Sequence, residues 1–389
     1  MSKVKLGIIG LGNMGSGHIR SITSGLVPEI ELGAVADRLE SRRDWVKTVL
    51  PEGVPVYEDG MELIKSGKCE AVLIVTPHYE HPFLAIEGFK AGLHVLCEKP
   101  AGVYTKQVVE MNKAAKESGK VFAMMFNQRT NSYFRKMHEL VQGGSLGAIK
   151  RVNYIITNWY RPQVYYDSGD WRATWDGEGG GVLLNQCPHN LDLLQWICGM
   201  PSAVRAFCHN GKWHNIEVED DVTAYLEYPN GATGVFVTTT ADAPGSNRLE
   251  ITLEWGKLLM EDNTNLTLYK LDQNEREFCK TATNGFSMPG ITTEKIETDG
   301  SNEQHNGILK NFAARILRNE PLIAEGQEGI NGLTLSNAMH LSSWLETTVK
   351  IPFDDELYLS ELNKKRALSK KKEGVNSKVF DSNESFNAR

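Results

Sequence analysis

The chain has 389 residues, 41% of them hydrophobic and 23% charged, and its formal net charge is −7. Because single hydrophobic cores rarely exceed about 250 to 300 residues, this length predicts two domains. The acidic balance offers no broad basic surface to nucleic acid, and no apolar stretch reaches the roughly 18 residues of a membrane span. No apolar leader precedes the first predicted strand, so we expect a cytoplasmic protein without a membrane or nucleic-acid partner.

The amino-terminal segment joins an apolar run to a glycine-rich turn. Gly10, Gly12 and Gly15 have the spacing Gly-x-Gly-x-x-Gly directly after this predicted strand. Such a turn brings backbone N–H groups and a helix N-terminus to a pyrophosphate. A second apolar run ends in Asp37, 37 − 15 = 22 positions after the last glycine, where a carboxylate that binds ribose belongs. The sequence therefore predicts a dinucleotide site, and the alternative is a structural turn that binds nothing.

Short β-rich runs alternate with helical patterns over the first 126 residues. The predicted strands are residues 4–10, 30–36, 71–76, 94–97 and 121–126. This alternation predicts a parallel sheet with helices on both faces and a ligand beyond the carboxyl ends of its strands. Thr76-Pro77 and Glu98-Lys99-Pro100 each follow such a strand, so we expect both to face the same crevice as the glycine-rich turn.

Longer alternating strands follow a predicted helix at residues 132–142. They include residues 149–159, 204–208, 222–228 and 232–240, and Pro229-Asn230-Gly231 predicts a hairpin between the last two. Further helices are predicted at residues 182–197 and 328–346. An open antiparallel sheet leaves one face to be covered, and a second copy of the chain is one way to cover it. Beyond Asp354 the polar composition predicts a mobile or loosely docked tail.

Cysteine and lysine clusters have simple interpretations. The six cysteines include no Cys-x-x-Cys pair, so we expect reduced core residues. No Cys, His or carboxylate cluster has the spacing of metal ligands, and we expect no metal. The lysine-rich segments at residues 364–366 and 370–372 favour a solvated tail helix, with a local binding patch as the alternative.

Lys99 is a candidate proton carrier. Burial beside a cationic nicotinamide would lower the pKa of its amine toward the working range. The alternative is a surface lysine in a strand-to-helix loop.

The helix predicted at residues 182–197 carries a polar stripe. At 100° per residue, Asn185, His189, Asp192 and Trp196 fall on one narrow face. Hydrogen bonds within the protein would satisfy such a stripe, or it could face a polar substrate with His189 as general base. The glycines before it, at 177 and 179–181, suit a close approach to a ligand and favour the second interpretation.

Aromatic residues are unusually dense between residues 154 and 175. Seven of these 22 residues are aromatic, where the average of 8% predicts about two: Tyr154, Trp159, Tyr160, Tyr165, Tyr166, Trp171 and Trp175. Sugar rings stack on such side chains, and aromatic residues also populate interfaces between subunits. Both uses remain open.

Between Val4 and about Pro352 these motifs together resemble the Gfo/Idh/MocA oxidoreductase family. The resemblance implies an amino-terminal Rossmann domain, a second domain built on a large open sheet, and dimers or tetramers formed through that sheet. It also implies a nicotinamide cofactor and sugar or cyclitol substrates. In such enzymes the lysine of Glu-Lys-Pro, here Lys99, takes part in proton relay, and the Lys-Pro bond is often cis.

The pattern and the resemblance together give an α/β chain in three parts. Residues 1–126 are the expected NAD-binding Rossmann domain. Residues 127–353 are the expected α+β domain for substrate binding and oligomerisation, with its large, mainly antiparallel open sheet. Residues 354–389 are the polar tail.

The implied site has three groups of residues. The expected cofactor contacts are Gly10, Gly12, Asn13, Met14, Gly15, Asp37, Arg38, Thr76, Pro77, His81, Glu98, Lys99 and Asn127. The expected substrate contacts are Tyr166, Trp171, Arg172, Asn185 and His189, and the expected catalytic residues are Lys99, His189 and Asn185. Asp37 favours NAD because a carboxylate repels a 2′-phosphate, although Arg38 could accommodate one.

One position departs from the family pattern. The usual Asp-x-x-x-His is Asn185-Gln186-Cys187-Pro188-His189, so an amide replaces a carboxylate. An amide cannot take a proton from a substrate hydroxyl, and the base must be His189, Lys99 or both. Whether Asp192 or Asp176 supplies the lost negative charge is open at this stage.

The leading hypothesis is an NAD-dependent dehydrogenase. It would transfer a hydride between a secondary hydroxyl of a sugar, glycoside or cyclitol and the nicotinamide. One alternative is a glycoside-processing enzyme that oxidises its substrate transiently, eliminates, and returns the hydride without consuming cofactor. Another is a non-catalytic NAD-binding regulator, against which the presence of both Lys99 and His189 argues.

Overall fold

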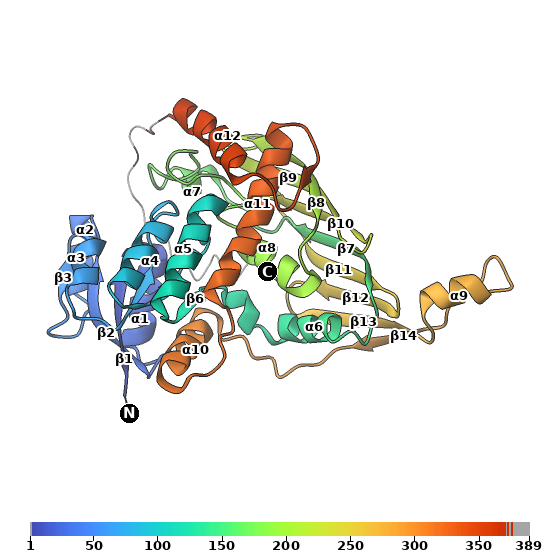
Figure 1. Ribbon diagram of the computed structural model, residues 1–389, viewed down its shortest axis with the longest axis horizontal. Helices are drawn as coiled ribbons and strands as arrows, with labels where there is room; N and C mark the ends of the chain where they lie inside the picture. The colour runs from blue at the N-terminus through green and yellow to red at the C-terminus, as the bar shows by residue number, and fades with distance from the viewer. Residues whose placement is uncertain (1, 371, 373–374, 376–389) are drawn as a thin grey trace.

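The computed structural model describes residues 2–370, 372 and 375, which fold around two β-sheets (Figure 1). The first sheet has the order β3-β2-β1-β4-β5-β6, and every neighbouring pair is parallel. Its strands are β1 (Val4–Ile9), β2 (Ile30–Ala36), β3 (Val56–Tyr57), β4 (Ala71–Ile74), β5 (His94–Cys97) and β6 (Phe122–Met124). Its helices are α1 (Asn13–Thr23), α2 (Glu40–Lys47), α3 (Gly60–Lys65), α4 (Glu80–Lys90) and α5 (Thr105–Ser118).

This parallel sheet confirms the predicted Rossmann-type architecture. The apolar runs are buried on both faces, as every residue of β4 shows. The strand order reverses between β1 and β4, and such a point opens a crevice at the carboxyl ends of the strands. Strand β3 was not predicted, because two residues are too few to show a periodic pattern.

The second sheet has nine strands in the order β14-β13-β12-β11-β7-β10-β9-β8-β15. Only β7 and β10 pair in parallel, so the sheet is mainly antiparallel, as expected. Its strands are β7 (Ile149–Ile156), β8 (Ala203–Asn210), β9 (Glu219–Glu227), β10 (Thr233–Thr239), β11 (Asn247–Leu253), β12 (Gly256–Glu261), β13 (Asn265–Leu271), β14 (Ile291–Lys295) and β15 (Val349–Lys350). The predicted hairpin joins β9 to β10, and Gly231 adopts φ +84° in its turn.

Helices cover one face of this second sheet. Figure 1 places α6 (Ser132–Gln142), α8 (Pro188–Cys198) and α11 (Gly329–Trp344) between the sheet and the first domain. The remaining helices are η1 (Asn127–Thr130), α7 (Gln163–Tyr166), α9 (Glu275–Thr281), α10 (Gln304–Arg318), η2 (Gly326–Glu328) and α12 (Asp355–Leu368). Along β9 the residues alternate between buried and exposed, so the other face of the sheet is open in the described part of the chain. Helix α9 and the loop between it and β14 extend away from the body of the molecule (Figure 1), and Phe286 in this loop is fully exposed.

The helix predicted at residues 182–197 is shorter than expected. It begins at Pro188, and residues 182–187 form turns instead. Proline fits the first helical position, and it disfavours helical backbone in the residue before it. The backbone N–H groups of Gly181 and Leu183 bond to the Glu219 carboxylate at 2.9 and 3.0 Å, which holds the turn outside the helix.

The expectation of a loose tail beyond Asp354 is wrong for residues 355–368. These residues form α12, capped by the Asp354 carboxylate, and Tyr358 and Leu362 are fully buried. The chain then crosses a loop of the second domain, where Arg366 pairs with Asp176 at 2.9 Å and the Lys372 amine donates to the Tyr166 carbonyl at 2.9 Å. The rest of the predicted tail, residues 371, 373–374 and 376–389, lies outside the described residues.

The cysteines and the helix lengths can be compared with the expectations from the sequence. All six cysteines are unpaired, and Cys97, Cys187 and Cys198 are buried, but Cys279 is exposed on α9 rather than in the core. Within the described residues, no helix combines the length and apolar character that crossing a membrane requires.

Candidate active site

The glycine-rich turn lies at the carboxyl end of β1. Gly10 adopts φ +98°, and a Cβ there would lie 2.5 Å from the Val75 carbonyl oxygen. A Cβ on Gly15 would lie 2.0 Å from the Gly10 carbonyl oxygen, so neither position accepts a side chain. A Cβ on Gly12 would meet no described atom within 4 Å outside its chain neighbours. The turn is therefore packed from behind and open in front, at the start of α1 where Asn13 and Met14 lie, and this fits a dinucleotide pyrophosphate.

Asp37 lies beside this turn. Its carboxylate accepts hydrogen bonds from the N–H groups of Leu11 at 2.7 Å and Leu39 at 2.8 Å. These contacts fix the carboxylate at the end of β2, next to the glycines. Arg38 pairs with Glu80 at 2.7 Å, so a carboxylate already holds the guanidinium that could accommodate a 2′-phosphate.

His81 connects the two loops that follow β4 and β5. Its Nε2 lies 2.7 Å from the Thr76 carbonyl oxygen, and its Nδ1 lies 2.7 Å from that of Pro100. Both ring nitrogens are thus used within the protein, and the ring is 1% exposed. His81 was expected to contact the cofactor, and in the structure its two ring nitrogens face carbonyl oxygens of the loops of Thr76-Pro77 and Lys99-Pro100. The Thr76 hydroxyl, in contrast, is buried without a hydrogen-bond partner among the described residues.

Two other predicted cofactor contacts are engaged inside the protein. Glu98 is buried and pairs with His18, with 2.8 Å between Oε1 and Nε2. Although burial opposes ionisation, the hydrogen bond and charge of His18 lower the pKa of Glu98 to about 2. The Asn127 amide nitrogen donates to Gln304, while its oxygen has no partner in the described part of the chain.

Lys99 joins the two domains. Its peptide bond to Pro100 is cis, and its amine donates a hydrogen bond to the backbone oxygen of Asn185 at 2.9 Å. Burial lowers the pKa of Lys99, and the nearby carboxylates of Glu98 and Glu178 oppose this effect. The loop that follows β5 in the first domain thus contacts Asn185, which follows the glycine-rich segment of the second domain.

His189 lies in the first turn of α8 and is 3% exposed. Neither of its ring nitrogens has a hydrogen-bond partner among the described residues. Burial, followed by the charge of Lys99, holds the pKa of His189 well below its usual range, so the imidazole is neutral. Because an unpaired buried polar group is costly, these nitrogens mark a place where a bound ligand would supply a partner.

The carboxylate that Asn185 lacks is present nearby, on Glu178. Glu178 is 1% exposed and accepts hydrogen bonds from the Asn185 side-chain amide and, at 2.5 Å, from the Ala173 N–H group. Asp192 cannot fill this role because Arg129 binds both of its oxygens, at 2.6 and 2.8 Å. Asp176 is exposed and pairs with Arg366. Both aspartates were candidates for this role from the sequence and Glu178 was not, although a lone carboxylate among glycines was the available signal.

The predicted polar stripe is therefore divided in the structure. Asn185 and His189 lie by Lys99, whereas Asp192 belongs to a buried ion pair with Arg129. Trp196 stacks on His138, with ring centroids 4.0 Å apart.

Arg172 contacts two residues of the aromatic segment, Tyr165 and Trp171. Its Nη1 donates to the Tyr165 hydroxyl at 2.7 Å, and its guanidinium lies 4.5 Å from the Tyr165 ring centroid and 4.6 Å from that of Trp171. The expected substrate contact Tyr166 is buried, and its hydroxyl bonds to Thr240 at 2.7 Å. Tyr165 is instead the neighbour whose hydroxyl faces the Asn185 side chain, at 3.4 Å.

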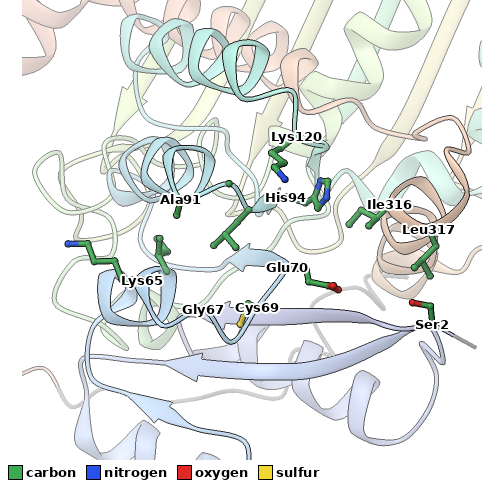
Figure 2. Close-up of a pocket in the computed structure, with 13 residues that line it drawn as sticks. Ser2, Lys65, Gly67, Cys69, Glu70, Ala91, His94, Lys120, Ile316 and Leu317 are labelled. Carbon is green, nitrogen blue, oxygen red and sulfur yellow. The ribbon is translucent and has the colours of Figure 1, made fainter.

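A hollow of about 640 Å³ lies elsewhere, at the amino ends of the parallel strands (Figure 2). Lys65, Glu70, His94 and Lys120 are among the residues that line it, and none of the predicted site residues does. Ligands of such sheets bind at the opposite, carboxyl edge, and the candidate site stays there. Among the described residues, no three His, Cys, Asp or Glu side chains group as metal ligands.

A dinucleotide turn on a Rossmann-type sheet, a buried lysine after β5 and a buried histidine without a partner among the described residues are features of an NAD-binding oxidoreductase. Residues 4–126 match the oxidoreductase family model described as an NAD-binding Rossmann fold, and residues 134–259 match the GFO/IDH/MocA C-terminal domain. The chain belongs to the Gfo/Idh/MocA oxidoreductase family, and its relatives include proteins named as an inositol dehydrogenase and a glucoside dehydrogenase.

Several relatives have informative names. A myo-inositol 2-dehydrogenase of Thermotoga maritima is 25% identical over 90% of this chain and 98% of its own length. A D-glucoside 3-dehydrogenase of Escherichia coli is 28% identical over 52% of this chain and 61% of its own. The crystal structure of the WlbA dehydrogenase from Bordetella pertussis with NADH and UDP-GlcNAcA is 25% identical, has a TM-score of 0.75, and covers 90% of this chain and 100% of that one.

Proposed function

We propose that the chain transfers a hydride between a secondary hydroxyl of a sugar, glycoside or cyclitol and NAD. The observation that carries this proposal is the hydrogen bond from the Lys99 amine of one domain to Asn185 of the other, near His189, whose ring nitrogens have no partner in the described part of the chain. The relatives named above are dehydrogenases of an inositol and a glucoside, and the WlbA structure contains a nucleotide sugar. These ligands share a ring that bears secondary hydroxyls.

The residues present fit the cofactor. The turn from Gly10 to Gly15 would hold the pyrophosphate, and the Asp37 carboxylate would accept the ribose hydroxyls, which favours NAD over NADP. Bound NAD would supply the hydride acceptor in the oxidative direction. The buried Thr76 hydroxyl lacks a partner among the described residues and is available to the same ligand.

The substrate residues divide the remaining tasks. Lys99 or His189 removes the hydroxyl proton, because both are buried bases whose pKa values are lowered by their surroundings. Trp171 and Tyr165 offer aromatic faces to the sugar ring, and Arg172 and Asn185 offer hydrogen-bond donors to its hydroxyls.

A panel of pyranosides, inositols and glycosides tests the proposal. Each compound is incubated with the protein and either NAD or NADP, and reduced cofactor is followed by its near-ultraviolet absorbance. We expect turnover of at least one compound, faster with NAD. Silence across the whole panel would overturn the function, and a consistent preference for NADP would overturn the role given to Asp37.

We also infer that copies of the chain associate through the open face of the nine-stranded sheet, as a homodimer or homotetramer. Phe207 is 53% exposed and Tyr225 is 43% exposed on this face. The strand register places Phe207 opposite Thr223 and Tyr225 opposite Val235, so these side chains share one surface. A cytoplasmic location stays a prediction from the sequence.

A further inference from the structure

We propose that Glu178 is a positioning residue of this site, which holds Asn185 in place and supplies the negative charge that residue 185 does not carry. The inference rests on the proposed function. The family pattern has a carboxylate at position 185, near Lys99, and this chain has the amide of Asn185 there. Another carboxylate must then stabilise the protonated form of Lys99.

The backbone around Glu178 directs its side chain inward. Gly179 adopts φ +85°, and a Cβ there would lie 2.2 Å from a methyl carbon of Val103. A Cβ on Gly181 would lie 1.9 Å from the Glu219 carbonyl oxygen. Only glycines fit this close approach, and they bring the segment against both domains. The Glu178 backbone oxygen also lies 3.2 Å from His78 Nδ1 of the first domain.

The contacts of the Glu178 side chain form a chain that ends at Lys99. One carboxylate oxygen accepts from the Asn185 amide, and the Asn185 backbone oxygen accepts from the Lys99 amine at 2.9 Å. Arg172 Nη1 lies 3.9 Å from the carboxylate oxygen that accepts from the Asn185 amide, and the other carboxylate oxygen accepts from the Ala173 N–H group. Burial raises the pKa of Glu178, and the guanidinium of Arg172 and the two hydrogen-bond donors oppose this rise by stabilising the ionised form.

Charges of both signs surround Lys99. The carboxylates are Glu98 and Glu178, and the cations are Arg161 and Arg172. The other titratable neighbours are the imidazoles of His78, His81, His189 and His305 and the thiol of Cys187. Around Glu178 itself lie Tyr166, Arg172, Glu219 and Lys372.

Glu98 and Glu178 differ in what they can do for the lysine. Glu98 already forms a buried pair with His18. Glu178 has only the longer contact to Arg172 as a charged partner among the described residues. The charge of Glu178 is therefore the one that is left to stabilise the ammonium form of Lys99.

In the oxidative direction the proton and the electrons separate at the substrate carbon. The hydroxyl O–H bond breaks, its electrons form the second C–O bond, and the C–H pair leaves as hydride to NAD. The proton ends on the Lys99 amine, which becomes an ammonium group. Glu178 receives no proton, but its carboxylate favours the ammonium form and its hydrogen bond keeps Asn185 fixed.

The test replaces Glu178→Gln, which removes the charge and retains the size. We expect kcat/KM to fall about 100-fold, because the charge near Lys99 and the fixed position of Asn185 are both lost. We also expect the acid limb of the kcat/KM profile to move to lower pH by roughly one unit. The sign follows because Lys99 loses a nearby negative charge, its pKa falls, and the amine is neutral at lower pH.

A second readout needs no substrate. Lysines are methylated reductively with carbon-13, and the Lys99 signal, assigned with Lys99→Arg, is titrated by NMR. Glu178→Gln should lower the titration midpoint, whereas Glu178→Asp, which keeps the charge, and the matched control Asp176→Asn should leave it in place. An unchanged midpoint in Glu178→Gln overturns this inference even if the sugar panel succeeds. A lowered midpoint supports it even if the panel is silent, so the two failures are distinguishable.

Discussion

The Lys99 amine lies between a carboxylate that is already paired and a backbone carbonyl of the other domain. Glu98 is paired with His18, and the Asn185 carbonyl oxygen accepts a hydrogen bond from the Lys99 amine. Burial lowers the pKa of Lys99, so a larger fraction of the amine is neutral near pH 7 than for an exposed lysine. A neutral amine at this place is the form that can accept a hydroxyl proton.

Replacing Lys99→Met should lower turnover by a factor of about 100 or more, because general-base catalysis contributes about 10²- to 10⁴-fold. NAD binding should persist, since the glycine-rich turn and Asp37 are untouched. Initial rates and calorimetry of NAD binding measure the two effects. Lys90→Met, on the exposed side of α4, is the matched control and should change neither. Equal rates for the Lys99 variant and the original chain would remove the lysine from the proposed mechanism.

At the scale of single residues, the sequence was most informative for residues that come directly after a predicted strand. They placed Lys99 at the mouth of the crevice and grouped it with Asn185 and His189, and the structure brings these three together. They missed Glu178, because the inward direction of its carboxylate depends on packing of the adjacent glycines against Val103 and Glu219. Such contacts between distant segments leave no periodic signal.

At the scale of elements, buried strands and long helices were predicted well, and segment ends were not. The strand predicted at residues 30–36 has those bounds in β2, since both of its ends are marked by a change from polar to apolar residues. The helix that contains His189 was predicted to include residues 182–187, because the apolar residues Val182, Leu183 and Leu184 are buried in turns and mimic a helical pattern. A solvated helix was predicted at the lysine-rich end of α12, but its docking on the core was missed, since only Tyr358 and Leu362 of its residues are buried.

Helix α12 should contribute measurably to folding stability. Leu362→Ala removes a fully buried side chain, and such changes cost about 2 to 5 kcal/mol. Leu368→Ala, at the exposed end of the same helix, should have little effect, because its side chain is 78% exposed. Denaturant unfolding of both variants gives the comparison. Indistinguishable midpoints would mean that α12 is the loose tail that its composition predicted.

At the scale of the whole molecule, the nine-stranded sheet has a covered face and an open face. The covered face holds the helices that position His189, and the open face carries Phe207, Tyr225 and Val235. Residues of the candidate site come from the first domain and from the covered side. Association through the open face therefore leaves the site accessible.

Charged substitutions on the open face should weaken the proposed association. The double variant Phe207→Glu and Tyr225→Glu places like charges at the centre of that face, and sedimentation should show a smaller species than the original chain. Leu26→Glu, an exposed leucine of the first domain, is the control and should not change the mass. An original chain that sediments as a 43.4 kDa monomer would refute the association through this sheet.

The last described segment of the chain crosses the loop that holds Arg172 and Glu178. The ribosome makes this loop before it makes the segment that crosses it. Arg366 reaches Asp176 across 190 positions, and Lys372 reaches the Tyr166 carbonyl across 206. A ribosome that has translated Glu178 has thus made the acidic group long before it makes the residues that clamp its loop. These two contacts can form only after Arg366 and Lys372 have left the exit tunnel, and every strand of both sheets precedes them in the chain.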